Sequence, residues 1–172
     1  MNERPTYVEQ VATYESVADE ATGLTATASS DLPTQGFASY NGVARMEIRP
    51  DGGNDADPAL DILTSDVLIK ADFAASRVSG NMRNFNSATD GALDGALTIA
   101  PVDLNRYDPA VPQYTATAEG SLELYGETRS RSLVVKGGFG GPNAEVTGGS
   151  LRGVTPSTDG DLLVTGGFIA KQ

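Results

Sequence analysis

Hydrophobic and polar residues alternate one by one along most of the chain after Gly36. The clearest run is residues 114–124, in which apolar residues and glycine take every second position and Thr, Ser and Glu take the positions between. A period of two is typical of a β-strand with one buried face, because successive side chains of a strand point to opposite sides of its sheet. The pattern therefore predicts β-structure from the mid-thirties to the end of the chain.

Eight segments of this kind follow one another, separated by stretches rich in Gly, Pro, Asn and Asp. Strands are expected near residues 38–48, 66–73, 78–85, 93–100, 114–124, 129–139, 144–153 and 162–170. Connections of hairpin length favour antiparallel neighbours in sequence order, and closing eight strands into a ring pairs both edge strands. The sequence thus predicts an all-β fold, a closed eight-stranded antiparallel up-and-down β-barrel. Charged residues on the polar face and the lack of Trp favour a soluble barrel over a membrane barrel.

The first 31 residues follow a different pattern. Residues with apolar or aromatic side chains recur at the spacing of one helix face: Tyr7, Val11, Tyr14 and Ala18. Thr6 precedes this run and Glu9 stands three positions later, as in a capping box, while Gly23 is suited to end a helix. We therefore expect a short amphipathic helix or arm with a polar connector in residues 1–31, and the barrel domain in residues 32–172.

Two roles are open for the expected helix. In the first, it lies across one mouth of the barrel and covers the interior. In the second, it is an arm that docks onto another molecule, and Tyr7, Val11 and Tyr14 are then the candidate partner-docking residues.

Composition narrows the classes of function. The formal net charge of −11 disfavours nucleic acid as a partner, since phosphate backbones are bound by clustered Lys and Arg. The sequence contains neither Cys nor His, which removes zinc sites built on thiolates and the commonest general base. No apolar run approaches the roughly 20 residues of a membrane helix, so no transmembrane segment is expected. The first residues do not resemble a signal peptide, which leaves localisation open between the cell surface, if a signal was removed, and a released particle.

Candidate chemistry outside the strands is sparse. Asp51, Asn54, Asp55 and Asp57 offer oxygen atoms to calcium, but their spacing departs from the known calcium-loop patterns and favours a solvated acidic turn. Glu119 and Glu123 share the polar face of one expected strand, where no apolar surroundings would raise a carboxyl pKa for acid catalysis. We expect no catalytic residue, no metal site and no cofactor.

The best candidate for recognition is the proline-rich loop after residue 100. Tyr107 and Tyr114 flank this loop, and an exposed tyrosine is a common anchor in protein interfaces. Arg106 stands beside the first of them. These three residues are the predicted ligand-binding residues.

The last quarter of the chain carries a family resemblance. The uninterrupted run Gly-Pro-Asn-Ala-Glu at residues 141–145, within GGFGGPNAEVTGG, is followed by SLRG and by GDLLVTGGFIAKQ. These segments, with LPTQGFASYNGVA and ADFAASRVSGNMRNF upstream, resemble the barrel domain of the transferrin-binding protein B family of bacterial surface lipoproteins. Leu151 stands where the family usually has an aromatic residue. The resemblance covers roughly residues 32–172 and implies a soluble eight-stranded barrel whose relatives bind host iron proteins, haem or complement regulators.

Two hypotheses of function follow. The first is a non-enzymatic extracellular recognition module that binds a host protein, a glycan or a small nutrient ligand. The second is a structural spike or fibre component of a phage-like or secreted particle, anchored by the N-terminal helix to other subunits and attaching to a protein or glycan on a cell surface.

Overall fold

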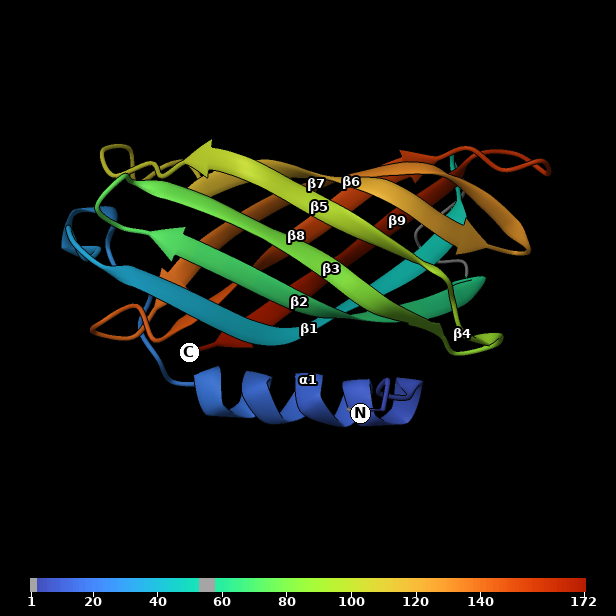
Figure 1. Ribbon diagram of the computed structural model, residues 1–172, viewed down its shortest axis with the longest axis horizontal. Coiled ribbons are helices and arrows are strands. Elements are labelled where there is room, and N and C mark those ends of the chain that lie inside the picture. The colour runs from blue at the N-terminus through green and yellow to red at the C-terminus, as the bar shows by residue number, and fades with distance from the viewer. Residues whose placement is uncertain (1–2, 53–57) are drawn as a thin grey trace.

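Eight strands form a closed antiparallel barrel in the computed structural model, which describes residues 3–52 and 58–172 (Figure 1). Each strand pairs with the next, and the last returns to the first. The ring consists of β1 (Phe37–Pro50), β2 (Asp61–Asp72), β3 (Arg77–Ser87), β5 (Gly95–Asp103), β6 (Tyr114–Leu124), β7 (Glu127–Gly140), β8 (Val146–Thr155) and β9 (Leu162–Lys171). The two-residue β4 (Gly91–Ala92) pairs with β3 outside the ring. The predicted up-and-down barrel is confirmed.

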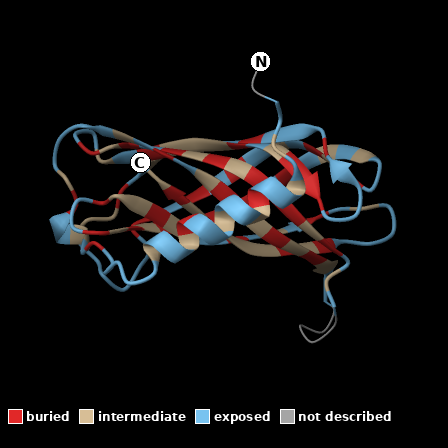
Figure 2. Cartoon of the chain, turned by 90° about the horizontal axis from the view of Figure 1, so that it is seen from below, coloured by how far each residue is buried: buried red, intermediate tan, exposed pale blue. Residues whose placement is uncertain are grey.

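Buried and less buried residues alternate along most of the strands (Figure 2), because successive side chains point to opposite faces of the sheet. An aromatic cluster fills one end of the interior. The ring of Phe139 lies 5.5 Å from Tyr40, 5.6 Å from Phe73 and 5.7 Å from Tyr114, measured between centroids. Such tilted pairs add to the hydrophobic gain of burial. This cluster makes that end of the barrel a packed core.

One strand differs from its predicted bounds for a physical reason. The expected second strand began at residue 66, whereas β2 begins at Asp61. The ladder between β2 and β3 shifts register between Thr64 and Asp66, and Asn84 on the partner strand has a positive φ of 54°. A β-bulge of this kind breaks the strict alternation of side chains, so the period of two could not reveal the first half of the strand.

An α-helix, α1 (Tyr7–Ala21), lies along the outside of the barrel (Figures 1 and 2). The predicted capping box is present, because Thr6 and Glu9 bond each other's backbone N–H. The helix contacts β1, β2 and β9. The expectation that it crosses a barrel mouth is therefore wrong. One end of the barrel is covered instead by the connector, residues 22–36, which includes a short 3-10 helix at Ser29–Asp31. Leu32 of the connector belongs to the hydrophobic core.

The helix is held to the barrel by a buried amide. Gln10, which is 1% exposed, donates from Nε2 to Asp66 Oδ1 (2.7 Å) and to the carbonyl of Asn84 (3.0 Å). Its Oε1 accepts from Thr64 Oγ1 (2.6 Å) and from Asn86 Nδ2 (2.8 Å). All hydrogen-bonding positions of the amide are thus filled. The helix docks through polar specificity as well as through Val17, its one buried apolar side chain.

Candidate functional site

The three predicted ligand-binding residues lie in different surroundings. Tyr107 is 92% exposed, on the loop between β5 and β6. Tyr114 is 1% exposed and its hydroxyl bonds Thr147 Oγ1 at 2.7 Å inside the barrel. Burial raises the pKa of Tyr114 far above its ordinary value. Tyr114 is therefore not the exposed anchor that the sequence suggested, because it points into the core at the start of β6.

Arg106 is committed to the fold. Its guanidinium donates to the carbonyls of Leu32 (3.1 Å), Pro33 (2.7 Å) and Phe73 (3.0 Å), and its Nε donates to Ser76 Oγ (2.9 Å). These bonds join the connector, the β2–β3 turn and the β5–β6 loop at one end of the barrel. The structure does not bring Arg106, Tyr107 and Tyr114 together into one site. A ligand that bound Arg106 would have to replace hydrogen bonds that its guanidinium already makes.

The loop that carries Tyr107 is ordered by its own side chains. Asn105 Oδ1 accepts from the backbone N–H of Tyr107 (3.2 Å) and of Asp108 (3.0 Å), and Asp108 Oδ1 accepts from that of Ala110 (2.9 Å). The backbone N–H of Asn105 also donates to the carbonyl of Gln113 at 2.7 Å, which closes the base of the loop. Such turns hold a loop in one conformation. Tyr107 is therefore presented on a pre-organised loop.

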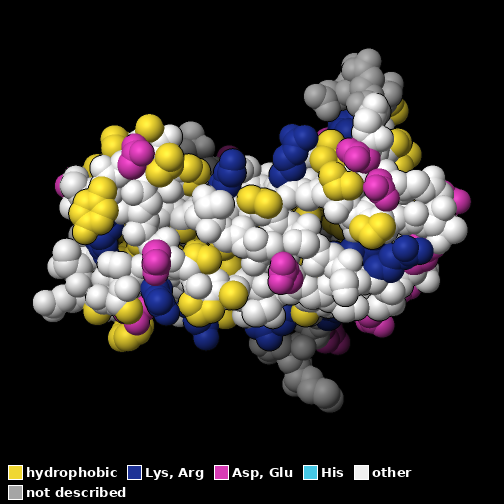
Figure 3. Space-filling view, turned by 90° about the horizontal axis from the view of Figure 1, so that it is seen from above, with side chains coloured by type: hydrophobic (Ala, Val, Ile, Leu, Met, Phe, Trp, Pro, Cys, Tyr) yellow, Lys and Arg dark blue, Asp and Glu magenta, His cyan; other side chains and the backbone are white. Residues whose placement is uncertain are grey.

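A groove with a volume of about 560 Å³ lies on the outer wall beside this loop. We call it the connector groove. It is lined by the connector, by the far side of the β5–β6 loop and by paired residues of β7 and β8: Ala26–Ser29, Pro109, Val111–Gln113, Lys136–Phe139 and Gly148–Ser150. In Figure 3 apolar side chains are seen at both ends of the molecule, including the left end, where the connector and this loop lie in Figure 1. The groove is thus an apolar hollow with Lys136 at its rim.

Two pairs of glycines line the floor of the connector groove: Gly137 with Gly149, and Gly138 with Gly148. Close packing requires glycine only in the first pair. A Cβ on Gly137 would lie 2.3 Å from the Tyr114 ring, and one on Gly149 would lie 1.9 Å from the carbonyl oxygen of Lys136. A Cβ on Gly138 or Gly148 would meet its nearest neighbour only at 3.2 or 3.1 Å. Gly138 and Gly148 therefore keep side chains out of the groove floor, although close packing does not demand glycine there as strongly.

Gln113 joins the connector to the barrel at the base of the groove. Its Nε2 donates to the carbonyl of Thr27 (2.6 Å), and its Oε1 accepts from the backbone N–H of Phe139 (2.6 Å). The connector also pairs with the end of β7 through a bridge between Ala26 and Gly140. Gln113 could not be identified from the sequence, since a lone glutamine in a loop carries no pattern that marks it.

The predicted partner-docking residues lie on the inner side of α1. Tyr7, Val11 and Tyr14 are half-buried, on the helix face that also carries Gln10 and Val17. The Tyr14 hydroxyl lies 3.5 Å from the place that a Cβ on Gly167 of β9 would take. The face therefore packs on the barrel of its own chain, and docking onto a partner stays a prediction.

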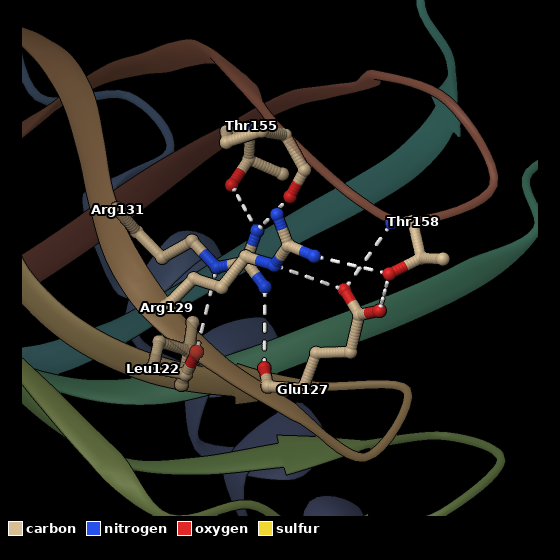
Figure 4. A network of polar contacts seen from close by, with 7 residues as sticks. Leu122, Glu127, Arg129, Arg131, Thr155 and Thr158 are labelled. Atoms are coloured by element: carbon tan, nitrogen blue, oxygen red, sulfur yellow. Dashed lines mark hydrogen bonds and ion pairs between the residues drawn. The ribbon is translucent and has the colours of Figure 1, made fainter.

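A second polar network closes the opposite end of the barrel (Figure 4). Arg131, which is 5% exposed, donates from Nη1 to Thr155 Oγ1 (2.5 Å) and to the carbonyl of Pro156 (2.6 Å). Its other nitrogens reach the carbonyls of Leu122 (3.4 Å) and Glu127 (3.3 Å). Burial lowers the pKa of Arg131. This guanidinium joins β6, β7 and β8 where the β7–β8 ladder has already ended.

Most of the candidate calcium ligands lie outside the residues that the structure describes. Asn54, Asp55 and Asp57 lie outside the described residues, and Asp51 alone of the four lies within them. Among the described residues, no three His, Cys, Asp or Glu side chains are grouped so that they could hold a metal ion. In that same part of the chain, no helix is long and apolar enough to cross a membrane.

The fold and the groove define a class of protein: a closed antiparallel barrel with a hollow beside the loops at one of its ends. The chain belongs to the family described as the C-lobe and N-lobe β-barrels of transferrin-binding protein B, which its sequence matches over residues 32–172. The resemblance predicted from residues 141–145 is thereby confirmed. No curated protein matches the chain.

Two solved structures are similar in fold. A single-substitution variant of the vaccine antigen transferrin-binding protein B from Haemophilus parasuis Hp5 aligns with 86% of this chain and 28% of that chain, at 20% identity and a TM-score of 0.51. A double-substitution variant of the same antigen aligns over the same shares at 22% identity and a TM-score of 0.49. The chain therefore spans about 28% of the length of these relatives. At such identity the likeness shows the barrel fold alone.

Proposed function

We propose that this chain is a non-enzymatic surface binding module that engages a protein partner through the β5–β6 loop and the connector groove. The family supports a binding role, since its description names a binding protein. The observation that carries the proposal is Tyr107, a 92% exposed tyrosine on a loop that is already ordered. Pre-organisation lowers the entropy cost of binding, and tyrosine is among the residues that most often dominate interface energetics.

The groove beside the loop complements this anchor. Val111 is exposed at its wall, and Lys136 stands at its rim where it pairs directly with Ser150. An apolar hollow with one cationic edge suits a protein segment that presents an apolar side chain next to a carboxylate. The solved relatives are named for binding transferrin, so transferrin is the first partner to test.

The test is a binding measurement with purified transferrin, followed by a panel of purified serum proteins, on the immobilised chain. We expect one of them to bind, and we expect Tyr107→Ala to weaken that binding by about 10- to 30-fold, as loss of an interface anchor of about 2 kcal/mol does. Lys136→Ala is expected to weaken it less. Surface plasmon resonance gives both affinities.

Tyr125→Asn is the matched control. Tyr125 is also exposed, but it lies in the β6–β7 turn at the opposite end of the barrel, where its positive φ of 52° suits asparagine. This variant should bind like the parent chain. If no protein of the panel binds, or if the two tyrosine variants bind alike, the proposed surface is wrong.

The alternative hypothesis, a particle component anchored by the N-terminal helix, is less well supported. It needs the apolar stripe of α1 to contact another subunit, whereas Tyr7, Val11 and Tyr14 face the barrel of their own chain. Glycan and small-nutrient ligands are not favoured by the apolar connector groove.

A further inference from the structure

A second groove, distinct from the connector groove, runs between α1 and the outer wall of β1, β2 and β3. We call it the helix groove; it has a volume of about 350 Å³ and shares no lining residue with the connector groove. Its lining is Pro5, Gln10, Thr13, Val17, Asn41–Val43, Asp66–Leu68, Asn81, Arg83, Asn84 and Lys171. Figure 2 shows the helix crossing this wall obliquely. Most of the side chains that line it are polar, unlike those of the connector groove.

The strand register places its polar side chains in two rows. Asn41 pairs with Leu68, and Leu68 pairs with Asn81, so two primary amides flank one leucine across three strands. In the next row Val43 pairs with Asp66, and Asp66 pairs with Arg83. Residues directly opposite in antiparallel strands have neighbouring side chains. The groove floor therefore has Leu68 between two amides in one row, and the Asp66 carboxylate between Val43 and the Arg83 guanidinium in the next.

Arg83 lies opposite a carboxylate that is bonded to other groups. Although Asp66 lies directly opposite, the oxygens of Asp66 accept from Gln10 Nε2 (2.7 Å) and from Asn84 Nδ2 (2.7 Å). Within residues 3–52 and 58–172, Arg83 forms no ion pair, and its side chain is exposed. The other cation of the groove, Lys171, is paired with Glu20 at 2.5 Å. The cationic position open to a ligand is thus Arg83.

We propose that the helix groove binds an acidic sugar, a pyranose ring that carries a carboxylate. A guanidinium holds a carboxylate through two parallel N–H···O bonds. The amides of Asn41 and Asn81 each offer a donor and an acceptor, which suits the hydroxyl groups on the edge of the ring. The face of the ring lies on Leu68. The volume is at the lower end of the range of small-molecule sites. This site is independent of the proposed protein partner.

The experiment is an NMR titration of the ¹⁵N-labelled full chain with sodium glucuronate and, in parallel, with glucose. We expect saturable shifts at the amides of residues 41, 68 and 81 with glucuronate and none at the β5–β6 loop. Glucose, which keeps the ring and hydroxyls but lacks the carboxylate, is expected to bind at least about 10-fold more weakly, the effect of losing one charged hydrogen-bonding pair.

Arg83→Gln should weaken glucuronate binding by a similar factor, and Asn81→Ala by a smaller one. Arg77→Gln is the control, since Arg77 is an exposed arginine on the same strand that pairs with Asp103 at the far end. It should bind like the parent chain. Equal affinity for glucose and glucuronate, equal loss in the two arginine variants, or no saturable shift at the groove would each overturn the proposal.

Discussion

Two tyrosines at the ends of one loop illustrate how far surroundings decide the role of a residue. Tyr107 stands free on the surface, while Tyr114 is enclosed by the barrel and bonded to Thr147. Gly137 on the neighbouring strand is what makes room for the Tyr114 ring. The phenol at 107 is available for recognition, and the phenol at 114 contributes to stability.

Alkaline pH should destabilise the fold through its buried phenols. Burial raises the pKa of Tyr114 and of Tyr40. The unfolded chain releases these protons near pH 10, whereas the folded chain retains them. Each phenol therefore stabilises the fold fully below about pH 10, and its contribution is lost as the pH rises through the folded-state pKa, at about 1.4 kcal/mol per pH unit. Urea unfolding at pH 8, 10 and 11 measures this slope.

Tyr114→Phe should remove the contribution of one phenol to the fall of the unfolding free energy with pH. At pH 8 it should lower the unfolding free energy by about 1 kcal/mol, because one hydrogen bond is lost. Thr147→Val is the control, because it removes the same bond, together with the one that Thr147 donates to the carbonyl of Gly138 (2.9 Å), but leaves the phenol in place. If the stability of Tyr114→Phe falls with pH as steeply as that of Thr147→Val, the Tyr114 phenol is not a cause of the alkaline destabilisation.

Several residues that organise the structure could not be predicted from the sequence. Gln10, Arg106 and Gln113 bond side chains or carbonyls far away in the chain, and no local period marks them. Arg131 bonds both near residues and the distant Thr155 and Pro156, and no pattern marks it either. The exposure of Tyr107 was predicted because a proline-rich loop is a local signal, while its role in binding stays a prediction. The capping box of Thr6 and Glu9 was predicted for the same reason. By contrast, the helix groove depends on register between three strands, which the sequence does not specify.

At the scale of elements, the helix lies outside the main hydrophobic cluster, whereas the connector contributes Leu32 to it. Every member of the main hydrophobic cluster lies between Leu32 and Ala170. The helix adds Gln10 and Val17 as buried side chains, and both pack on the outer wall. We therefore propose the boundary between residues 31 and 32 as a domain boundary.

A chain trimmed to residues 32–172 should fold as a barrel with reduced stability. The loss of α1 and its contacts is expected to cost about 2 kcal/mol, which lowers the midpoint of thermal unfolding by about 4–8 °C. Circular dichroism gives both the strand signal and the midpoint. Replacing Gln10 by Ala in the full chain should account for about half of this loss. A trimmed chain that does not fold would show that residues 3–31 belong to the barrel domain.

At the scale of the whole molecule, the barrel is closed differently at its two ends. At one end the connector pairs with the end of β7 through a bridge between Ala26 and Gly140, and its Leu32 packs in the core. At the other, Arg131 replaces the backbone bonds that the β7–β8 ladder no longer makes. The alternating pattern predicted that the strands form a ring, but the two closures depend on single side chains.

Removing the Arg131 guanidinium should loosen the second end. Arg131→Met leaves buried carbonyl and hydroxyl groups without donors and is expected to destabilise the chain by about 2–4 kcal/mol. Arg129→Met is the control, since Arg129 lies two positions earlier in the same network but is more exposed and pairs with Glu127 at 3.1 Å. Surface pairs contribute about 1 kcal/mol or less. Equal urea midpoints for the two variants would exclude the proposed closure.

The four bonds of the Gln10 amide limit how α1 can move. Each of its partners belongs to the outer wall, so water can replace all four once the helix departs, and no core side chain has to follow. A helix displaced by a single turn, however, would keep these polar atoms covered and unpaired, at about 1–3 kcal/mol each. For these four bonds, sliding along the wall is therefore costlier than release of the helix into water.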